Sequence, residues 1–350
     1  MPTTNTDIAE LLAAAAEEAE GHRARAYRSA STAALMWGEE ASDLVAQDRS
    51  LTELERIGPS LAKRVRRWVE EEQKVSAPPP ARRDFLSYAE ARALVVSEPG
   101  APPLRGDLQM HTTRSDGKAT LEDMALTGAG LGYDYVAITD HSKGLKIAGG
   151  IDESTLASQA EEIAALNDRF TSDGTELSVL RSLEMNLDLE GNGDMDPRSL
   201  VGLDLVLGSF HSALRRTEDQ TERYLAAMSN PYVDVIGHPR GRKYNLRPGL
   251  RADWSRVLGA AAAAGKAMEI NAYPNRQDLS IDLLGLVRAA GGWVSIGTDA
   301  HDPTEMRFAA VGVAAALRAG IPRDRILNAL GRDELVAWVQ ERRARVVDML

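Results

Sequence analysis

Cysteine is absent from this sequence of 350 residues. A chain without cysteine cannot form a disulfide and cannot offer a thiolate to a metal ion. Any metal site must therefore be built from nitrogen and oxygen ligands, a set that suits zinc, manganese or iron.

A long apolar run is also missing. No stretch reaches the roughly 18 apolar residues that a membrane-spanning helix needs, and the most apolar one is interrupted by Gly265 and Lys266. The N-terminal segment has no basic region before its apolar residues and carries acidic residues among them, unlike a secretion signal. We expect a cytoplasmic protein with no membrane partner.

Positive charge is scarce, because 41 Lys and Arg residues face 52 Asp and Glu residues and leave a formal net charge of −11. Affinity for nucleic acid comes mainly from pairing Lys and Arg with phosphates, so this balance does not suggest a protein that coats nucleic acid. A local basic patch is compatible with it, and bound cations would reverse the local sign.

Histidine is placed in a pattern. Five of the six histidines lie in short segments spaced along the chain, whereas His22 stands alone in a helical region. Most of these segments begin with an apolar, strand-like run and end in the polar residue. The segments are GDLQMHTTRSDG (106–117), ITDHS (138–142), GSFHS (208–212), IGHP (236–239) and IGTDAH (296–301).

These segments predict a metal centre. In a barrel of parallel strands the carboxyl ends of the strands meet at one mouth, where imidazoles and carboxylates form a metal site. A single histidine is more often structural, but the joint placement favours ligands, and there are too many for one ion. We expect two to three divalent ions. The candidates are His111, Asp116, His141, Glu184, His211, His238, Asp299 and His301.

The chain exceeds the usual size of one domain, so a large and a small domain are expected. Apolar residues recur at helical spacing in residues 1–76, which predicts a helical domain. Residues 77–103 are interrupted by prolines and predict a linker, with a helical stretch at 85–96. Residues 104–350 form the second domain.

Strand-like and helical segments alternate from Leu104 onward, which is typical of parallel β/α units. There are seven strand candidates, and nearly all end in polar residues. A barrel with one active mouth explains this better than an open sheet. We predict an α/β protein: a distorted, TIM-like, seven-stranded β/α barrel with a small N-terminal all-α domain.

The segments GDLQMHTTRSDG, TDHS, SLEMN, GSFHS, GHP and TDAH together resemble the polymerase and histidinol phosphatase (PHP) family from about Leu104 to the C-terminus. More narrowly, they resemble the C-terminal PHP domain of bacterial X-family DNA polymerases. The resemblance implies hydrolysis of phosphoesters at a mouth that binds three divalent metals. The linker leaves no room for polymerase palm and fingers, so the chain cannot be a polymerase of that type.

The resemblance also implies a ligand set for each metal. The sets are His111, Glu184 and Asp299 for a first ion, Glu184, His211 and His238 for a second, and Asp116, His141 and His301 for a third. Gln109 stands in the first site where most members have histidine. An amide oxygen is a poorer ligand than imidazole for zinc or manganese, so this site is either weak or differently occupied. The same Gln occurs in some polymerase-linked PHP domains.

Other residues are candidates for chemistry and substrate binding. Glu184, His211 and Asp140 are expected to be catalytic. Asp140 and Asn271 are also candidates to hold the metal ligands in position through hydrogen bonds. Basic residues on loops at the mouth are expected to meet substrate phosphate, with ordinary solvated charges as the alternative. These residues are Lys143, Arg240 and Arg242, of which Arg240 is also a catalytic candidate.

The segment LTELERIGPSLAKRVRRWVEEE (51–72) resembles a helix-hairpin-helix, whose second helix can face a phosphate with its N-terminal amides. Arg56 stands where that motif usually has glycine. A hairpin used only for packing or dimerisation is the alternative. The candidate DNA contacts are Gly58, Lys63, Arg64 and Arg67.

Three classes of function follow. The first is a phosphoesterase acting on nucleic acid, either a 3′–5′ exonuclease or a 3′-end processing enzyme, with DNA as partner of the N-terminal domain. The second is a phosphatase for small phosphomonoesters, similar to histidinol phosphatase. The third is a binding module with a vestigial metal site, at which Gln109 hints. The oligomeric state is left open.

Overall fold

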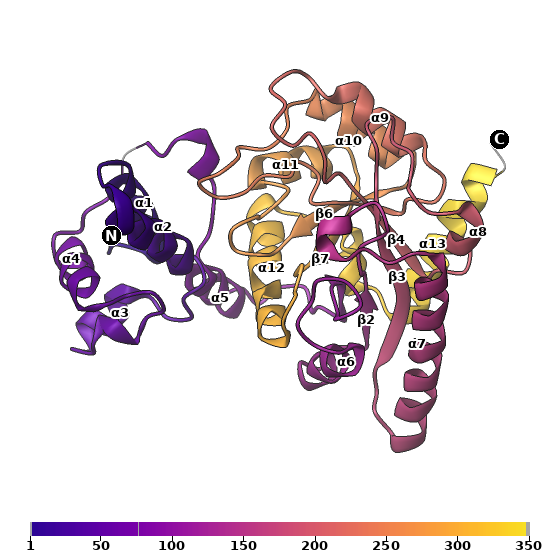
Figure 1. Ribbon diagram of the computed structural model, residues 1–350, viewed down its shortest axis with the longest axis horizontal. Coiled ribbons are helices and arrows are strands. Elements are labelled where there is room, and N and C mark those ends of the chain that lie inside the picture. Colours follow the sequence, from indigo (N-terminus) through magenta and orange to yellow (C-terminus); the bar gives the residue numbers. More distant parts are fainter. Residues whose placement is uncertain (1, 76, 348–350) are drawn as a thin grey trace. The chain divides into compact units, whose positions relative to one another are not determined.

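The computed structural model describes residues 2–75 and 77–347 (Figure 1). Contacts divide this part of the chain into two compact units. Unit 1 takes the chain up to Ala101, together with Arg242–Pro248 and Pro274–Gln277. Unit 2 takes Pro102–Gly241, Gly249–Tyr273 and the chain from Asp278 onward.

Unit 1 is helical. Helix α1 begins in a capping box, in which Thr4 and Asp7 satisfy each other's backbone N–H groups, and the Leu12 side chain on its inner face is fully buried. Leu44 and Trp68 join the same core. The helices are α1 (Asn5–Glu17), α2 (Gly21–Ala34), α3 (Ala41–Ala46), η1 (Leu51–Glu53), α4 (Pro59–Glu70), η2 (Pro80–Arg82) and α5 (Tyr88–Ser97).

Two later segments complete the core of unit 1. The Tyr244 hydroxyl donates to Glu10 Oε1 at 2.8 Å, and its ring meets the edge of Phe85 at 5.1 Å between centroids. Arg82 Nε donates to Glu10 Oε2 at 2.9 Å. Residues 77–103, which the prolines suggested to be a linker, therefore include buried side chains and two helices, because Arg82 and Phe85 find partners here.

Unit 2 is the predicted barrel. Seven strands are paired in parallel in the order of the sequence. His111 N donates to Ala300 O at 2.8 Å and Asp299 N to Gln109 O at 3.0 Å, so the first and last strands also meet and nearly close the ring. The strands are β1 (Gly106–Met110), β2 (Tyr135–Ile138), β3 (Ser178–Asn186), β4 (Leu205–Ser209), β5 (Val235–Gly237), β6 (Ala267–Asn271) and β7 (Trp293–Gly297).

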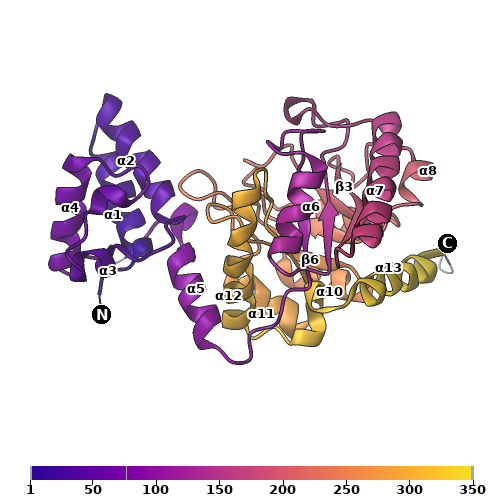
Figure 2. The same cartoon turned by 90° about the horizontal axis from the view of Figure 1, so that it is seen from below.

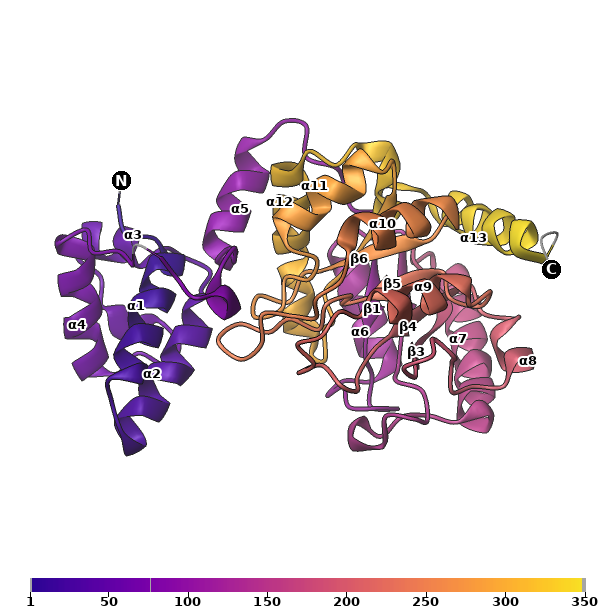
Figure 3. The same ribbon diagram turned by 90° about the horizontal axis from the view of Figure 1, so that it is seen from above.

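The helices of unit 2 surround the strands (Figures 2 and 3). Val136 and Ile138 of β2 pack in one apolar cluster with residues of α6 and α7, and Leu335 and Val339 of α13 pack in another. The helices are α6 (Leu121–Gly130), α7 (Glu153–Asp173), α8 (Pro197–Leu200), α9 (Thr221–Ser229), α10 (Trp254–Ala263), α11 (Ile281–Ala289), α12 (Ala309–Ala319) and α13 (Arg332–Val347), with short turns η3 (Lys146–Ala148), η4 (Pro303–Phe308), η5 (Arg323–Arg325) and η6 (Leu327–Ala329). Among the residues that the structure describes, no helix combines the length and the apolar composition needed to cross a bilayer.

Candidate metal centre

Glu184 of β3 is the hub of a buried cluster at the carboxyl ends of the strands. Its side chain is fully buried and four imidazoles surround it. Oε1 lies 2.8 Å from His238 Nε2 and 3.3 Å from His211 Nε2. Oε2 lies 3.0 Å from His141 Nδ1 and 3.5 Å from His111 Nε2. One carboxylate therefore reaches ligand atoms from four different strand ends.

A second carboxylate, Asp116, lies at the rim of the same cluster. Its Oδ1 is 3.3 Å from His301 Nε2 and 3.5 Å from His141 Nε2. The His111 ring stacks on both the His141 and the His301 ring, with centroids 4.3 and 4.4 Å apart, and those two rings are 6.4 Å from each other. The loop after β1 thus delivers both His111 and Asp116 to the mouth.

Two groups of side chains in the described chain could each hold a metal ion, since the ligand atoms in each group lie within 4.8 Å of one another. They are His111, Asp116, His141 and His301, and then His141, Glu184 and His211. Two further candidates touch these groups, since His238 meets Glu184 and Asp299 Oδ1 lies 3.2 Å from His111 Nε2. The structure thus brings together all eight side chains singled out from the sequence, and His141 belongs to both groups. Their assignment to particular ions stays a prediction.

Buried ligand atoms without hydrogen bonds fit a bound cation. Both oxygens of Glu184 and both nitrogens of His111 are buried and make no hydrogen bond, and the same holds for His141 Nδ1, His211 Nε2 and His238 Nδ1. Buried polar groups without partners are costly, and folded proteins rarely leave several together. The nitrogen and oxygen donors suit zinc, manganese or iron.

Burial and neighbouring charges shift the pKa values of the carboxylate and imidazoles in this cluster. Burial opposes the charge of Glu184, but the charges of His141, His238 and His211 outweigh it and hold the pKa of Glu184 well below its usual value. Burial lowers the pKa of His211, and it does the same for the pKa of His111. For His141 burial is outweighed by the charge of Glu184, and for His301 by the hydrogen bond to Asp116, so both pKa values are raised, that of His301 to about 9. Metal ligands must be neutral imidazoles, so a bound cation would have to displace protons from these two side chains.

Glu269 was not selected from the sequence, although it belongs to the same interior. It is fully buried on β6, and the backbone N–H of His238 donates to its Oε2. Burial raises the pKa of Glu269 well above its usual value, and the charges of Asp299 and Glu184 add to the shift, whereas a bound cation would oppose it. The available signal was an acidic residue within the apolar run KAMEIN, two positions before Asn271.

Asn271 and Asp140 hold the elements that carry the candidate ligands. Asn271 Nδ2 donates to Asp299 Oδ2 at 3.1 Å. Asp140 accepts from the backbone N–H of Thr112 at 2.8 Å, from the Ser115 hydroxyl at 2.5 Å and from Gln159 Nε2 at 2.6 Å. Asp140 therefore fixes the loop between His111 and Asp116.

The basic loop residues have partners of their own. The Arg240 backbone N–H donates to Asp278 Oδ2 at 2.9 Å, and its Nη1 lies 3.4 Å from Ser280 Oγ. Lys143 Nζ is 2.6 Å from Glu153 Oε1, with 44% of its side chain exposed. Arg240 is partly buried beside the strand end that carries His238.

Arg242, predicted to bind substrate, belongs to unit 1. It is buried, its guanidinium lies 4.0 Å from the centre of the Phe85 ring, and its Nη2 donates to Arg83 O at 2.9 Å. The sequence placed it at the mouth because it follows GHP. Its loop instead packs in the helical unit, and no pattern in the sequence near Arg242 predicts this packing.

The hairpin of unit 1 presents part of its predicted basic surface. Gly58 caps α4 and is exposed, as are Lys63 and Arg67. Arg64 differs, because its Nη1 donates to the Tyr27 hydroxyl at 2.6 Å and it lies over the Trp68 ring. Lys63 and Arg67 are therefore the freer of the predicted DNA contacts.

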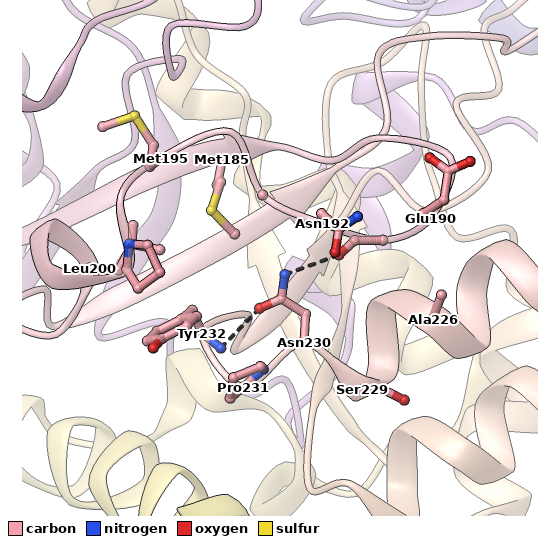
Figure 4. Close-up of a pocket in the computed structure, with 13 residues that line it drawn as sticks. Met185, Glu190, Asn192, Met195, Leu200, Ala226, Ser229, Asn230, Pro231 and Tyr232 are labelled. Carbon is pink, nitrogen blue, oxygen red and sulfur yellow. Dashed lines mark hydrogen bonds between the residues drawn. The ribbon is translucent and has the colours of Figure 1, made fainter.

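A cavity of about 470 Å³ lies on the other side of β3 (Figure 4). Met185 lines it, and because side chains alternate along a strand, its neighbour Glu184 points the opposite way, into the barrel. Asn230 also lines the cavity, and its Nδ2 donates to Gly191 O at 3.0 Å while its Oδ1 accepts from Tyr232 N at 3.1 Å. This cavity contains no candidate ligand.

Several known proteins are similar to this chain, although no family model matches it. The DNA polymerase/3′-5′ exonuclease PolX of Bacillus subtilis is 35% identical over 68% of this chain and 41% of its own length. A probable phosphatase of Edwardsiella ictaluri is 30% identical over 69% of this chain and 96% of its own length. The probable phosphatase YcdX of Escherichia coli is 28% identical over 63% and 89%.

One solved structure in the comparison is a histidinol phosphate phosphatase of Lactococcus lactis, in complex with zinc, L-histidinol and phosphate. It is 18% identical with a TM-score of 0.42, over 62% of this chain and 94% of that one. The chain thus spans less than half of PolX but nearly all of the Edwardsiella phosphatase. With its parallel barrel and its ordered histidine and carboxylate segments, the chain belongs to the PHP family of phosphoesterases.

Proposed function

We propose that this chain is a metal-dependent phosphodiesterase that shortens or trims nucleic acid from its 3′ end, at a centre of two to three divalent ions. The observation that carries the proposal is Glu184, buried among four imidazoles, with His141 shared between two groups of ligand atoms. Shared ligands set neighbouring ions close together, which suits attack on a phosphoester.

The residues of the barrel would divide the work. Divalent ions, when bound, neutralise phosphoryl oxygens and lower the pKa of water. Glu184, His211 and His238 would be ligands of one ion, and Asp140 keeps the loop of His111 and Asp116 in place. Arg240 follows His238 by two positions and would offer its guanidinium to a substrate phosphate oxygen.

Nucleic acid is favoured as substrate by two observations. PolX, one of the similar proteins, carries 3′-5′ exonuclease in its name. Unit 1 offers the exposed amides at Gly58 with Lys63 and Arg67 on the following helix, an arrangement that suits a backbone phosphate.

The test compares substrates on the full chain. We expect release of mononucleotides from a 5′-labelled single-stranded oligodeoxynucleotide with Mn²⁺, and little release of phosphate from p-nitrophenyl phosphate. Glu184→Gln is the control for contaminating nuclease. Lys63→Glu and Arg67→Glu should each weaken DNA binding and reduce its salt slope by about one, whereas Arg28→Glu, exposed on α2, should not.

A phosphatase for small phosphomonoesters is the second candidate, because the Edwardsiella phosphatase matches over 96% of its length. It predicts the reverse preference. Rapid hydrolysis of histidinol phosphate or p-nitrophenyl phosphate with no cleavage of DNA, and no effect of Lys63→Glu on turnover, would reject the nucleic-acid proposal.

A further inference from the structure

Four polar side chains form a connected layer beside the candidate ligands. Asn271 Nδ2 donates to Asp299 Oδ2 at 3.1 Å and lies 3.3 Å from the carboxamide atom of Gln109 that faces Glu269. Glu269 lies against the same carboxamide and against the backbone N–H of His238. All four side chains are buried, so their hydrogen bonds are made to one another and to the strand ends.

The environment of Gln109 selects one orientation of its amide. A bound cation would favour the ionised form of Glu269, and if the amide oxygen faced that carboxylate it would meet two acceptor oxygens against a single donor, Asn271 Nδ2. With the nitrogen facing Glu269, it donates to Oε2 at 3.2 Å and also to Oε1. The amide oxygen then points away from Glu269, and oxygen is the only atom of a carboxamide that binds divalent metals.

A glycine makes this contact possible. A Cβ atom at Gly297 of β7 would lie 2.6 Å from Gln109 Cβ and would collide with Glu269 Oε1. Non-bonded atoms do not approach each other this closely, so only glycine at 297 leaves room for Gln109 and Glu269 to meet. The pair is thus built by three strands, β1, β6 and β7.

We propose that Glu269 is a positioning residue, which turns the oxygen of Gln109 toward the metal centre. The inference rests on the proposed metal-dependent function. Glu269 holds the amide nitrogen, and the oxygen is left as ligand. The same carboxylate holds the backbone N–H of His238, whose φ of 24° is unusual for a residue with a side chain.

An isosteric change tests this step. In Glu269→Gln the new amide keeps an oxygen for His238 N and places its own nitrogen toward Gln109. Two amides pair only as donor and acceptor, so Gln109 must flip and present its nitrogen, which cannot bind a metal, to the centre. The volume of the side chain is unchanged.

The measurement is Mn²⁺ binding to the full chain by calorimetry, with the metal content of dialysed protein as a second readout. We expect Glu269→Gln to weaken one binding step by about tenfold or more, as loss of a supporting hydrogen bond does at metal sites. Gln109→Ala should weaken the same step. In the Gln109→Ala background, Glu269→Gln should add little, since the group through which it acts is gone.

Matched controls separate this effect from loss of charge or of fold. Glu162→Gln removes a partly exposed carboxylate that pairs with Arg114 and should leave Mn²⁺ binding unchanged. Gln109→His leaves Glu269 intact and gives it an imidazole N–H to hold, so Zn²⁺ binding should tighten about tenfold. This variant decides the matter if Glu269→Gln does not fold.

Unchanged Mn²⁺ affinity in Glu269→Gln, additive effects in the double variant, or no gain in Gln109→His would each overturn the proposal. These results are independent of the substrate. A protein that binds metal as expected and responds to Glu269→Gln, but cleaves no DNA, would refute only the proposed function.

Discussion

His238 Nε2 lies 2.8 Å from Glu184 Oε1, although the two residues belong to different strand ends, β5 and β3. His238 reaches this position with a positive φ, and its backbone N–H is held by Glu269. The contact ties the geometry of the candidate centre to the turn after β5.

Glu184→Gln should reduce hydrolysis about a hundredfold or more and lower the bound metal, because the amide keeps the shape and loses the charge that four imidazoles share. Activity and metal content of the same preparation check this. His211→Ala should act in the same direction. Activity near that of the parent protein in either variant would place the reaction elsewhere.

Removal of metal should destabilise unit 2. An ion that binds only the folded state at a hundred times its Kd stabilises it by about 2.7 kcal/mol. For a unit of this size that corresponds to roughly 5–10 °C in Tm. Calorimetry with EDTA and with added Mn²⁺ measures the shift, and an identical Tm in both would exclude a metal held by the folded barrel.

Glu40 should make the stability of unit 1 depend on pH. Burial, followed by the charge of Glu90, raises the pKa of Glu40 from 4.5 to about 7, although the N–H of Asn5 opposes the shift. The folded pKa exceeds the unfolded one, so the protonated carboxyl stabilises fully below pH 4.5, and this contribution is lost as pH rises through about 7.

Glu40→Gln removes this titration. Its amide can accept from Asn5 N and donate to the Ser87 hydroxyl, the groups that Glu40 contacts at 2.7 and 3.3 Å. At pH 8 we expect the variant to be more stable than the parent by about 1–3 kcal/mol. Urea unfolding at pH 5 and pH 8 tests this, and equal pH dependence in both proteins would contradict it.

Arg56 should tolerate glycine. Its φ of 65° is left-handed, a conformation that costs a residue with a side chain about 1–2 kcal/mol and glycine almost nothing. Its exposed pair with Glu55 contributes little. Arg56→Gly should therefore raise the free energy of unfolding by up to about 1 kcal/mol, after the extra freedom of the unfolded chain is counted. Arg56→Val should lower the free energy of unfolding. A valine variant more stable than the glycine variant would contradict the inferred backbone strain at residue 56.

The barrel could be predicted because each strand carries its own evidence. YVAI (135–138), for example, is an apolar run that forms β2, and the polar residues Asp140 and His141 follow it closely. Glu269 was missed because an acidic residue inside an apolar strand has no partner in its own segment. Its contacts come from β1 and the end of β5, which only tertiary structure brings near.

The placement of Arg242 could not be predicted from the sequence for the same reason. Local sequence indicates that it follows a strand end, and this is correct. Whether the loop then turns toward the mouth depends on Phe85, more than 150 positions away in the chain, with which Arg242 stacks. Contacts of this kind leave no periodicity in either segment.

The discontinuous make-up of unit 1 has a consequence for synthesis on the ribosome. Its buried polar partners include Tyr244, for Glu10, and Gln277, whose amide bonds to both backbone groups of Leu86. The helices up to Ala101 emerge first, but the 176 residues from 102 to 277 must follow before that set is complete. At typical bacterial speeds this takes about 9–35 s. Until Tyr244 emerges, Arg82 remains as the partner of Glu10 within the helices already made.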